Sequence, residues 1–307
     1  MVNSLAPIAL FVYNRLEHTQ KTVAALQKNT LAKESELFIF SDHAKSEAPI
    51  EKLDQVRAVR DYIKTISGFK KVEIIERNEN WGLAKSIMAG VTELTNKFGK
   101  VIVLEDDIVS SPYFLEYVNE ALDLYENDLE VVSVSGYIFP VKETLPETFF
   151  MKCANCWGWA TWKRGWAIFE PNGQKLLKEL REKNLTREFS FDHSYHYVEM
   201  LERQIVGINN SWAIRWYASA FLANKLTLYP GTSLVNNIGQ DGSGTHGNQT
   251  SAYSTKVSNR KINIKKLKEI ESQLGRYAVT NYFKSLKPKI WQKIIRKAAK
   301  ILYNRQK

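Results

Sequence analysis

Short apolar runs alternate with longer, more polar stretches through the first third of the 307-residue chain. The runs at 8–12, 36–41, 71–76 and 101–104 are rich in β-branched and aromatic side chains, which is typical of buried strands. The stretches between them predict helices near 19–28, 50–66 and 83–97. Strands and helices that alternate with short connections predict an α/β fold with a parallel, doubly wound sheet.

The pattern weakens beyond Pro112. We predict a helix near 113–127, a strand at 131–135, an aromatic-rich region and a mostly helical segment over about 174–223. Residues 229–247 contain five glycines together with Asp241 and His246. This composition favours a mobile loop that closes over a ligand and orders on binding. His246 is a candidate metal or phosphate ligand, although a histidine in a polar loop is more often simply solvated.

Polar side chains follow each predicted strand of the first third. Because ligands of open α/β sheets bind at the carboxyl ends of the strands, we expect these residues to meet in one crevice. They are Asn14 and Arg15 after the first strand, Asp42 after the second, residues 77–82 with Arg77, Asn80 and Gly82 after the third, and Glu105, Asp106 and Asp107 after the fourth.

The three consecutive carboxylates at 105–107 are the most distinctive part of this set. Adjacent acids repel one another and gain nothing from burial, so a bound divalent cation is one explanation for them. The other explanation is a solvated acidic turn that caps the helix after Pro112. These residues alone leave both explanations open.

Together, the crevice residues have the chemistry of a nucleoside diphosphate site. Asp42 can accept from a pyrimidine N–H, Arg15 and Arg77 suit phosphate, and a cation on the acids would neutralise a diphosphate. Taken singly, Asp42 is also explained as a turn cap and Arg15 as a surface charge. Neither a G-x-G-x-x-G motif nor a P-loop is present, which disfavours a dinucleotide cofactor and ordinary ATP hydrolysis.

Four tryptophans fall within ten residues, at 157, 159, 162 and 166. The glycine between the first two predicts a sharp turn with rings exposed to a pocket, and indole faces suit the apolar faces of sugars. Core packing is the alternative, and we expect some rings in the core and at least one at an acceptor site. Cys153 and Cys156 form a lone C-x-x-C, for which we predict buried, inert thiols rather than a redox pair or half a zinc site.

The net charge of +10 is concentrated in residues 284–307, which hold nine Lys or Arg and no acid. The rest of the chain is therefore close to neutral, which argues against a nucleic-acid-binding face. Apolar residues of this tail, Trp291 among them, share one helical face, as in a helix that lies in an anionic membrane interface. A nucleic-acid-binding arm and a partner-binding helix are the alternatives, and the apolar face makes the membrane the preferred one.

The apolar opening of the chain, residues 5–13, lacks a basic leader and is broken by Pro7. We interpret it as the first strand and not as a signal peptide. No apolar run reaches about 18 residues, so we expect no membrane-spanning helix.

Four motifs occur in a fixed order: Phe-Val-Tyr-Asn-Arg at 11–15, Asn-Trp-Gly-Leu at 80–83, Leu-Glu-Asp-Asp at 104–107 and Trp-Gly-Trp-Ala-Thr-Trp at 157–162. In this order they resemble glycosyltransferases of the GT-A fold, and within it bacterial family-2-like enzymes related to N-acetylglucosaminyltransferase I. Segments 211–219 and 237–246 also resemble the family, so the resemblance covers about residues 7–250.

The resemblance implies a Rossmann-like, mostly parallel sheet flanked by helices. Residues 1–110 would form a nucleotide-sugar-binding half, and residues 111–250 the acceptor-binding half of the same domain, with a mobile loop at 231–250. Residues 251–307 would form a helical, basic, membrane-associating tail with an amphipathic helix.

The resemblance also implies roles for single residues. Asp107 would bind Mn²⁺ or Mg²⁺, with His246 as a candidate second ligand, while Glu105 and Asp106 contact the donor sugar or ribose. Asp42 would read uracil, and the loop from Asp241 to His246 would close over the diphosphate. The remaining donor-binding candidates are Tyr13, Asn14, Arg15, Arg77, Asn80 and Gly82, and the acceptor-binding candidates are Trp157, Trp159 and Trp212.

The implied reaction is an inverting single displacement, in which the metal stabilises the departing diphosphate and a base removes the acceptor proton. The base departs from the family pattern. Relatives often have an aspartate two residues after the serine of the Ser-Trp motif, where this chain has Ala213. Our candidates are Asp192 and Asp241, with a slight preference for Asp192, although a helix cap is its ordinary explanation. Glu199 is a poorer third because it falls within a predicted helix.

The leading hypothesis is thus a hexosyl- or N-acetylhexosaminyltransferase that uses a UDP-linked donor and a lipid-linked saccharide acceptor in bacterial surface polysaccharide synthesis. We expect a cytoplasmic protein, peripheral on the inner face of the cell membrane, with no nucleic-acid partner. A sugar nucleotidyltransferase would carry a glycine-rich basic loop where this chain has Tyr-Asn-Arg-Leu. A catalytically silent saccharide-binding protein is the other alternative, and Ala213 is its support.

Overall fold

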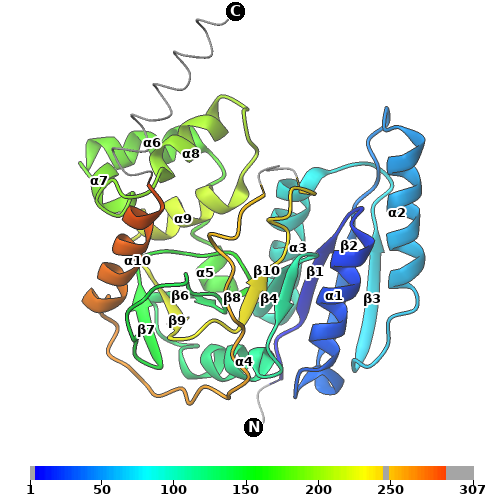
Figure 1. The fold of residues 1–307 in the computed structure, drawn as a ribbon, viewed down its shortest axis with the longest axis horizontal. Helices are drawn as coiled ribbons and strands as arrows, with labels where there is room; N and C mark the ends of the chain where they lie inside the picture. Colours follow the sequence, from blue (N-terminus) through cyan, green and yellow to red (C-terminus); the bar gives the residue numbers. More distant parts are fainter. Residues whose placement is uncertain (1–3, 245–248, 288–307) are drawn as a thin grey trace, which may run out of the picture.

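The computed structural model describes residues 4–244 and 249–287. In these residues one eight-stranded sheet, in the order β3-β2-β1-β4-β8-β6-β9-β7, runs through both halves of the chain, and a separate small sheet pairs β5 with β10 (Figure 1). Four of the seven strand pairs in the large sheet are parallel. The predicted α/β fold with a mostly parallel sheet flanked by helices is therefore confirmed.

The first half of the chain contributes the fully parallel part of the sheet. Its strands are β1 (Ile8–Val12), β2 (Glu36–Ser41), β3 (Lys71–Glu76) and β4 (Lys100–Glu105). Its helices are α1 (Leu16–Gln27), α2 (Ile50–Ile63) and α3 (Gly82–Phe98), with a 3-10 turn at Ala32–Glu34. Each strand and helix predicted here is present, with its ends shifted by a few residues at most.

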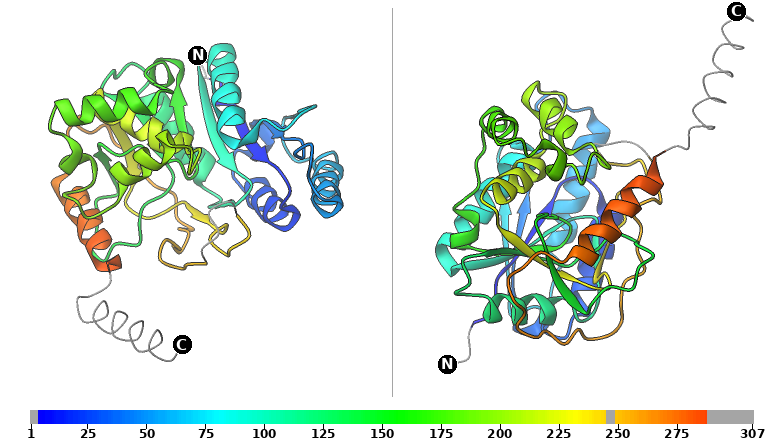
Figure 2. Two further views of the ribbon diagram at one scale, coloured as in Figure 1. Left: turned by 90° about the horizontal axis from the view of Figure 1, so that it is seen from above. Right: turned by 90° about the vertical axis from the view of Figure 1, so that its left-hand side faces the viewer.

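The second half completes the sheet and adds most of the helices. Its strands are β5 (Ile108–Ser110), β6 (Val131–Ser135), β7 (Thr148–Met151), β8 (Trp159–Trp162), β9 (Leu226–Pro230) and β10 (Val235–Asn237). Its helices are α4 (Phe114–Leu124), α5 (Lys163–Trp166), α6 (Gly173–Glu182), α7 (Thr186–Phe189), α8 (Tyr197–Ile205), α9 (Trp212–Leu222) and α10 (Gln273–Leu286). Figure 2 shows the two halves side by side, with the first in blue to cyan and the second in green to orange.

The sheet is buried on both faces, because its strands alternate between two apolar clusters. In β1, Ile8 and Leu10 belong to one cluster, which includes residues of α1 and α4, whereas Ala9 and Phe11 belong to the other, which includes residues of α3. This two-residue period is the expected consequence of a strand between two helical layers. It explains the continuous apolar runs of β1, β2 and β4, whereas β3, at the edge of the sheet, is only partly buried.

The carboxyl ends of β1, β4, β6 and β9 lie along one edge of the sheet. Strand β8 is antiparallel to both β4 and β6, so these two run in the same direction, and β9 is parallel to β6. The edge therefore extends from the acids after β4 to Pro230 at the end of β9. In a sheet of this kind it is the expected place for ligands.

The segment after β10 differs from the predicted helical tail. Residues 251–270 form no helix but run along α4, where the Leu267 amide donates to Tyr125 Oη at 3.0 Å and Lys261 Nζ to Glu116 Oε1 at 2.6 Å. These contacts replace the hydrogen bonds that a helix would make. Part of the predicted mobile loop is also regular structure, since β10 pairs with β5. The basic tail beyond Lys287 lies outside the described residues, and no described helix is long and apolar enough to span a bilayer.

Candidate active site

Arg15 joins two of the three acids at the end of β4. Its Nε and Nη2 atoms donate to the two carboxylate oxygens of Asp106. Nη2 also donates to Asp107 Oδ2, at 2.7 Å. The side chains of Arg15, Asp106 and Asp107 are 17%, 7% and 10% exposed. A buried carboxylate is unfavourable unless a positive charge or hydrogen-bond donors face it. The contact with Arg15 therefore explains how the two aspartates are tolerated in a buried position at the edge of the sheet.

The local sequence explains this geometry. β1 ends at Val12 and α1 begins at Leu16, so Arg15 stands at the helix N-cap position, at the carboxyl edge of the sheet. β4 lies next to β1, with Phe11 paired to Glu105. The acid trio and Arg15 therefore meet because two neighbouring parallel strands end together. On the same helix, Thr22 Oγ1 donates to the Asp106 carbonyl at 2.8 Å and fixes the turn after β4.

One carboxylate oxygen in this cluster lacks a partner. Asp107 Oδ1 is buried and receives no hydrogen bond, and Asp106 and Asp107 share Arg15 as their one ion-pair partner among the described residues. Burial raises the pKa of Glu105, and the neighbouring charges of Asp107 and Asp106 raise it further. Burial likewise raises the pKa of Asp106, although Arg15 opposes that shift. The cluster is thus short of positive charge.

This shortage fits a divalent cation. Mn²⁺ and Mg²⁺ prefer oxygen ligands, and Mg²⁺ is commonly held by one or two carboxylates together with the phosphates of a substrate. Asp107 Oδ1 supplies such a ligand. Within residues 4–244 and 249–287 there is no group of three or more His, Cys, Asp or Glu side chains placed to hold a metal. An ion here would thus depend on substrate oxygens as well as on Asp107.

The glycine loop, residues 238–244 after β10, lies directly against Asp107. A Cβ atom built on Gly239 would clash with Asp107 Oδ2 and would lie 2.8 Å from Arg15 Nη1, so a larger residue would have to displace these two side chains. The Ile238 amide donates to the Asp107 carbonyl at 2.9 Å. Asp241, further along the loop, accepts from the amide and hydroxyl of Ser243, and these bonds lower its pKa to about 2. Asp241 thus lies in the loop whose Gly239 is packed against Asp107.

His18 is a site residue that our sequence reasoning missed. It is 9% exposed, and its Nε2 lies 3.1 Å from Asp241 Oδ2. The available signal was its spacing, since residues three apart on a helix share a face and His18 follows Arg15 by three. His18 thus connects α1 to the glycine loop.

Asp42 organises the neighbouring loop at the end of β2. One of its carboxylate oxygens accepts from the amides of His43 and Trp81, and the other from the Gly82 amide and Asn80 Nδ2. A carboxylate has about four acceptor positions, so all of them are occupied. The capping explanation of Asp42 accounts for this arrangement, because these bonds fix the turn that begins α3.

Arg77 lies on this turn as a stacked cation. Its guanidinium carbon is 3.9 Å from the Trp81 ring centre and 5.5 Å from that of Phe40. Its Nε and one terminal nitrogen are buried without a hydrogen-bond partner. Asn14, by contrast, donates to Gln55 Oε1 at 3.1 Å. Burial, followed by the charge of Asp42, raises the pKa of Tyr13.

Comparison with known proteins identifies the family. The model named glycosyl transferase family 2 matches residues 8–191, more than half of the chain. The chain belongs to glycosyl transferase family 2. The matched region includes the acid trio, Arg15 and the Asp42 loop, and its sheet is of the GT-A type that the motifs predicted. The family makes this chain a glycosyltransferase that binds a nucleotide sugar. A search of curated proteins found no match.

Solved structures resemble this family 2 chain at low identity. The mannosyltransferase PcManGT from Pyrobaculum calidifontis, in complex with GDP-Man and Mn²⁺, is 12% identical with a TM-score of 0.39, and the alignment covers 71% of this chain and 75% of that one. S. aureus TarS is 14% identical, with a TM-score of 0.31 and coverages of 46% and 23%. A UDP-glucose pyrophosphorylase bound to UDP-glucose is 11% identical, with a TM-score of 0.35 and coverages of 74% and 90%.

The tryptophans of the family 2 domain divide between core and surface. Trp159 and Trp212 are 0% and 3% exposed and stack at 5.6 Å between ring centres. For Trp159 the expected exposure to a pocket is wrong, because α9 packs on its ring through Trp212 and, at 5.8 Å, through Trp216. Trp212, an acceptor-binding candidate, is enclosed in the same cluster. Trp157 is only partly buried and lies edge-on to Tyr137 at 4.7 Å. It is the one predicted acceptor-binding tryptophan with an accessible ring.

None of the contacts that Asp192 makes with described residues involves the acid trio. Asp192 is exposed, pairs with Arg187 Nε at 3.0 Å and lines a cavity of about 260 Å³ whose other residues all come from α10. Figure 1 shows α7 and α10 on the side of the molecule opposite β3. Glu199, the poorer third candidate, is exposed and pairs with His196. His246 lies outside the described residues.

The two cysteines are buried free thiols, in agreement with the prediction of inert groups. Burial raises the pKa of Cys153 to about 12 and that of Cys156 well above its ordinary value. Thiols of this kind are poor nucleophiles and metal ligands at neutral pH.

Proposed function

We propose that this glycosyltransferase is metal-dependent and inverting, and that it moves a sugar from a UDP-linked donor to a hydroxyl of a saccharide acceptor. The observation that carries the proposal is Asp107 Oδ1, a buried carboxylate oxygen without a partner in a cluster that is short of positive charge. It lies at the carboxyl edge of the sheet, beside Arg15 and the glycine loop. Family membership supports the transferase chemistry.

Asp107 would hold Mn²⁺ or Mg²⁺, which when bound supplies positive charge for the departing diphosphate. Arg15 keeps Asp106 and Asp107 in place and offers a second positive charge beside them. The unpartnered donors of Arg77, with the stacked Trp81, suit the nucleotide end of the donor. Gly239 leaves room for the loop to lie over the acids, so water is excluded from the reacting atoms when the loop is closed.

In the proposed reaction an acceptor oxygen bonds to the anomeric carbon while the bond from that carbon to the diphosphate breaks. The acceptor proton passes to a base, and the configuration inverts. Asp192 and Asp241 remain the candidates for this base. Asp241 has the better position, through His18 and Gly239, but its low pKa makes it a weak proton acceptor near neutral pH. Its contacts favour a role in holding the loop.

We further propose a lipid-linked acceptor in bacterial surface polysaccharide synthesis, at the inner face of the cell membrane. The support is the sequence of residues 284–307, with nine basic residues and an apolar face. Because α10 ends at Leu286, a chain cut after Lys287 retains every described element. Such a chain should lose binding to anionic liposomes and keep donor hydrolysis. Liposome binding equal to that of the full chain would refute the membrane role.

The function itself is tested with a thermal-shift panel of UDP- and GDP-sugars, each with and without Mn²⁺. A ligand at about 100 times its dissociation constant adds roughly 2.7 kcal/mol of stability. We expect a UDP-sugar to stabilise the protein only with the metal, and slow release of UDP. Stabilisation without any UDP release or transfer would indicate a silent binding protein. A sugar nucleotidyltransferase would instead release pyrophosphate from a nucleoside triphosphate and a sugar phosphate.

A further inference from the structure

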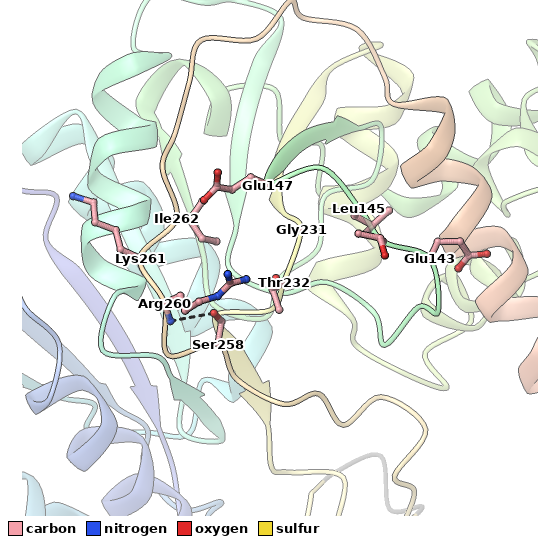
Figure 3. A pocket seen from close by; sticks show the side chains of 10 residues that line it. Glu143, Leu145, Glu147, Gly231, Thr232, Ser258, Arg260, Lys261 and Ile262 are labelled. Carbon is pink, nitrogen blue, oxygen red and sulfur yellow. Dashed lines mark hydrogen bonds between the residues drawn. The ribbon is translucent and has the colours of Figure 1, made fainter.

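A cavity of about 430 Å³ lies away from the acids, between three segments that are distant in the sequence. They are the loop that precedes β7, the turn that follows β9 and the extended segment after β10 (Figure 3). The volume is within the range of sites that hold small ligands. None of the residues that line it belongs to the acid cluster or to the Asp42 loop.

The cavity is on the same edge of the sheet as the acids. Its Gly231 follows Pro230 at the end of β9, and Pro230 pairs with Thr148 at the start of β7. Between β4 and β9 the sheet contains only β8 and β6. Three strand spacings of about 4.8 Å separate β4 from β9, or roughly 14 Å along this edge. An acceptor of a few sugar rings has a length of this order.

The walls of the cavity are held together by close backbone packing. A Cβ atom on Gly231 would clash with the Pro146 carbonyl, so the turn after β9 approaches the loop before β7 more closely than any other residue permits. The Gly231 amide also donates to the Glu147 carbonyl at 2.9 Å, and the Ser258 amide to the Ser233 carbonyl at 2.8 Å. All three wall segments are thus linked, and the cavity is preformed.

The lining is polar, and its charges balance. Glu143 and Glu147 oppose Arg260 and Lys261, and three hydroxyl groups come from Thr144, Thr232 and Ser258. A lining without net charge offers no advantage to an ion. It does offer both acceptors and donors at close range, which is what the hydroxyl groups of a sugar require.

Arg260 is exposed, and it is the charged lining residue whose side chain has no partner among the described residues. Lys261 is committed to Glu116 and Glu120, at 2.6 and 3.1 Å, and Glu147 Oε1 accepts from the Asn263 amide at 3.0 Å. The Arg260 guanidinium has neither an ion pair nor a hydrogen bond with any described residue, and it extends towards Thr232 at the centre of the lining (Figure 3). Five N–H donors of an arginine are therefore available to a ligand.

We propose that this cavity is a second saccharide subsite, which binds an uncharged sugar unit of the acceptor at a distance from the reacting hydroxyl. The inference rests on the proposed transferase function and adds a position for the far end of the acceptor. Arg260 donates to sugar hydroxyls, Thr232 and Ser258 exchange hydrogen bonds with them, and Leu145 and Ile262 contact the apolar edges of the ring. The subsite would make the enzyme prefer acceptors of several sugars over single sugars.

The test uses the full chain and neutral trisaccharides of glucose, mannose and N-acetylglucosamine, with binding followed by saturation-transfer NMR and calorimetry. We expect at least one to bind, and Arg260→Ala to weaken it about tenfold or more, the usual effect of losing hydrogen bonds from a charged donor. Lys256→Ala is the matched control, since Lys256 is an exposed cation of the same segment outside the lining. Thr232→Trp, which fills the cavity, should abolish binding.

Donor stabilisation and UDP release should be unchanged in Arg260→Ala, because the donor site is elsewhere. The subsite is refuted if no trisaccharide binds, or if binding survives both Arg260→Ala and Thr232→Trp. Failure of the transferase function has a different result, namely that no nucleotide sugar stabilises or is hydrolysed by the wild-type chain.

Discussion

His18 Nε2 lies 3.1 Å from Asp241 Oδ2, and this contact connects helix α1 to the glycine loop that covers Asp107. Arg15 begins the same helix and holds Asp106 and Asp107. Helix α1 therefore holds the acids through Arg15 at its N-cap and holds the glycine loop through His18 in its first turn. A change in the loop is linked by this helix to the geometry of the acid cluster.

Replacing His18 with alanine should raise KM for the donor with a smaller effect on kcat, because the loop loses its anchor while the acids remain. The loss of one hydrogen bond, about 0.5–1.5 kcal/mol, corresponds to roughly twofold to twelvefold in KM. His18→Asn retains an N–H donor and should recover part of the loss. Lys21→Ala, an exposed cation on the same helix, is the control. A KM for His18→Ala equal to that of wild type would show that the contact does not position the loop.

Asp107→Asn should reduce transfer by about two to three orders of magnitude, because the amide cannot supply the negative charge of the unpartnered oxygen. EDTA should have the same effect on wild type, and added Mn²⁺ or Mg²⁺ should reverse it. The measurement is product formation together with Mn²⁺ binding followed by electron paramagnetic resonance. Asp54→Asn, an exposed carboxylate paired with Arg57, is the control. Full activity of Asp107→Asn would remove the basis for metal dependence.

The base candidates are separated by two variants. Asp192→Asn should leave turnover unchanged within about twofold, because the side chain is exposed and its neighbours are Arg187 and α10. Asp241→Asn should act mainly on donor KM, since its pKa of about 2 makes it a weak base. A loss of kcat of about a hundredfold or more with donor binding intact would instead identify the affected residue as the base.

Cys153 and Cys156 should not react with a thiol reagent at pH 8 in the folded protein. Burial raises the pKa of Cys153 to about 12 and also raises that of Cys156, so the thiolate, which is the reactive form, is suppressed at that pH. In 6 M guanidinium chloride both cysteines should react, since both are free thiols. Rapid modification of the native protein would show that this region opens, and loss of activity on modification would give the pair a role.

The strands of the first half could be predicted because each is decided locally. An apolar run between polar residues, such as Ile8–Val12, is buried on both faces whichever neighbour it pairs with. The extended path of residues 251–270 could not be predicted in this way. It depends on partners such as Glu116 and Tyr125, which are far away in the sequence and carry no local signal.

The same distinction holds for the site. Arg15 and the acids were predicted to converge because both follow neighbouring strands, and parallel topology brings such ends together. The contact between His18 and Asp241 joins a helix to a loop near the other end of the domain, so no spacing along the chain indicates it. For Asp42 the sequence allows two explanations. Its four hydrogen bonds, one from the adjacent His43 amide and three from the loop after β3, show how the carboxylate is used.

The tryptophans provide a test in which stability and activity should separate. Trp159 is fully buried against Trp212 and Trp216, so Trp159→Ala should cost about 3–5 kcal/mol of stability, as for other large core deletions. Trp157 is partly exposed just before the start of β8, which is the acid edge because β8 is antiparallel to β4, so Trp157→Ala should cost less stability and should raise KM for the acceptor. Urea unfolding and acceptor kinetics measure the two effects. If the acceptor KM is unchanged in Trp157→Ala, Trp157 does not bind the acceptor. Trp159 and Trp212, the other two predicted acceptor-binding tryptophans, are enclosed in the core, so none of the three would then have that role.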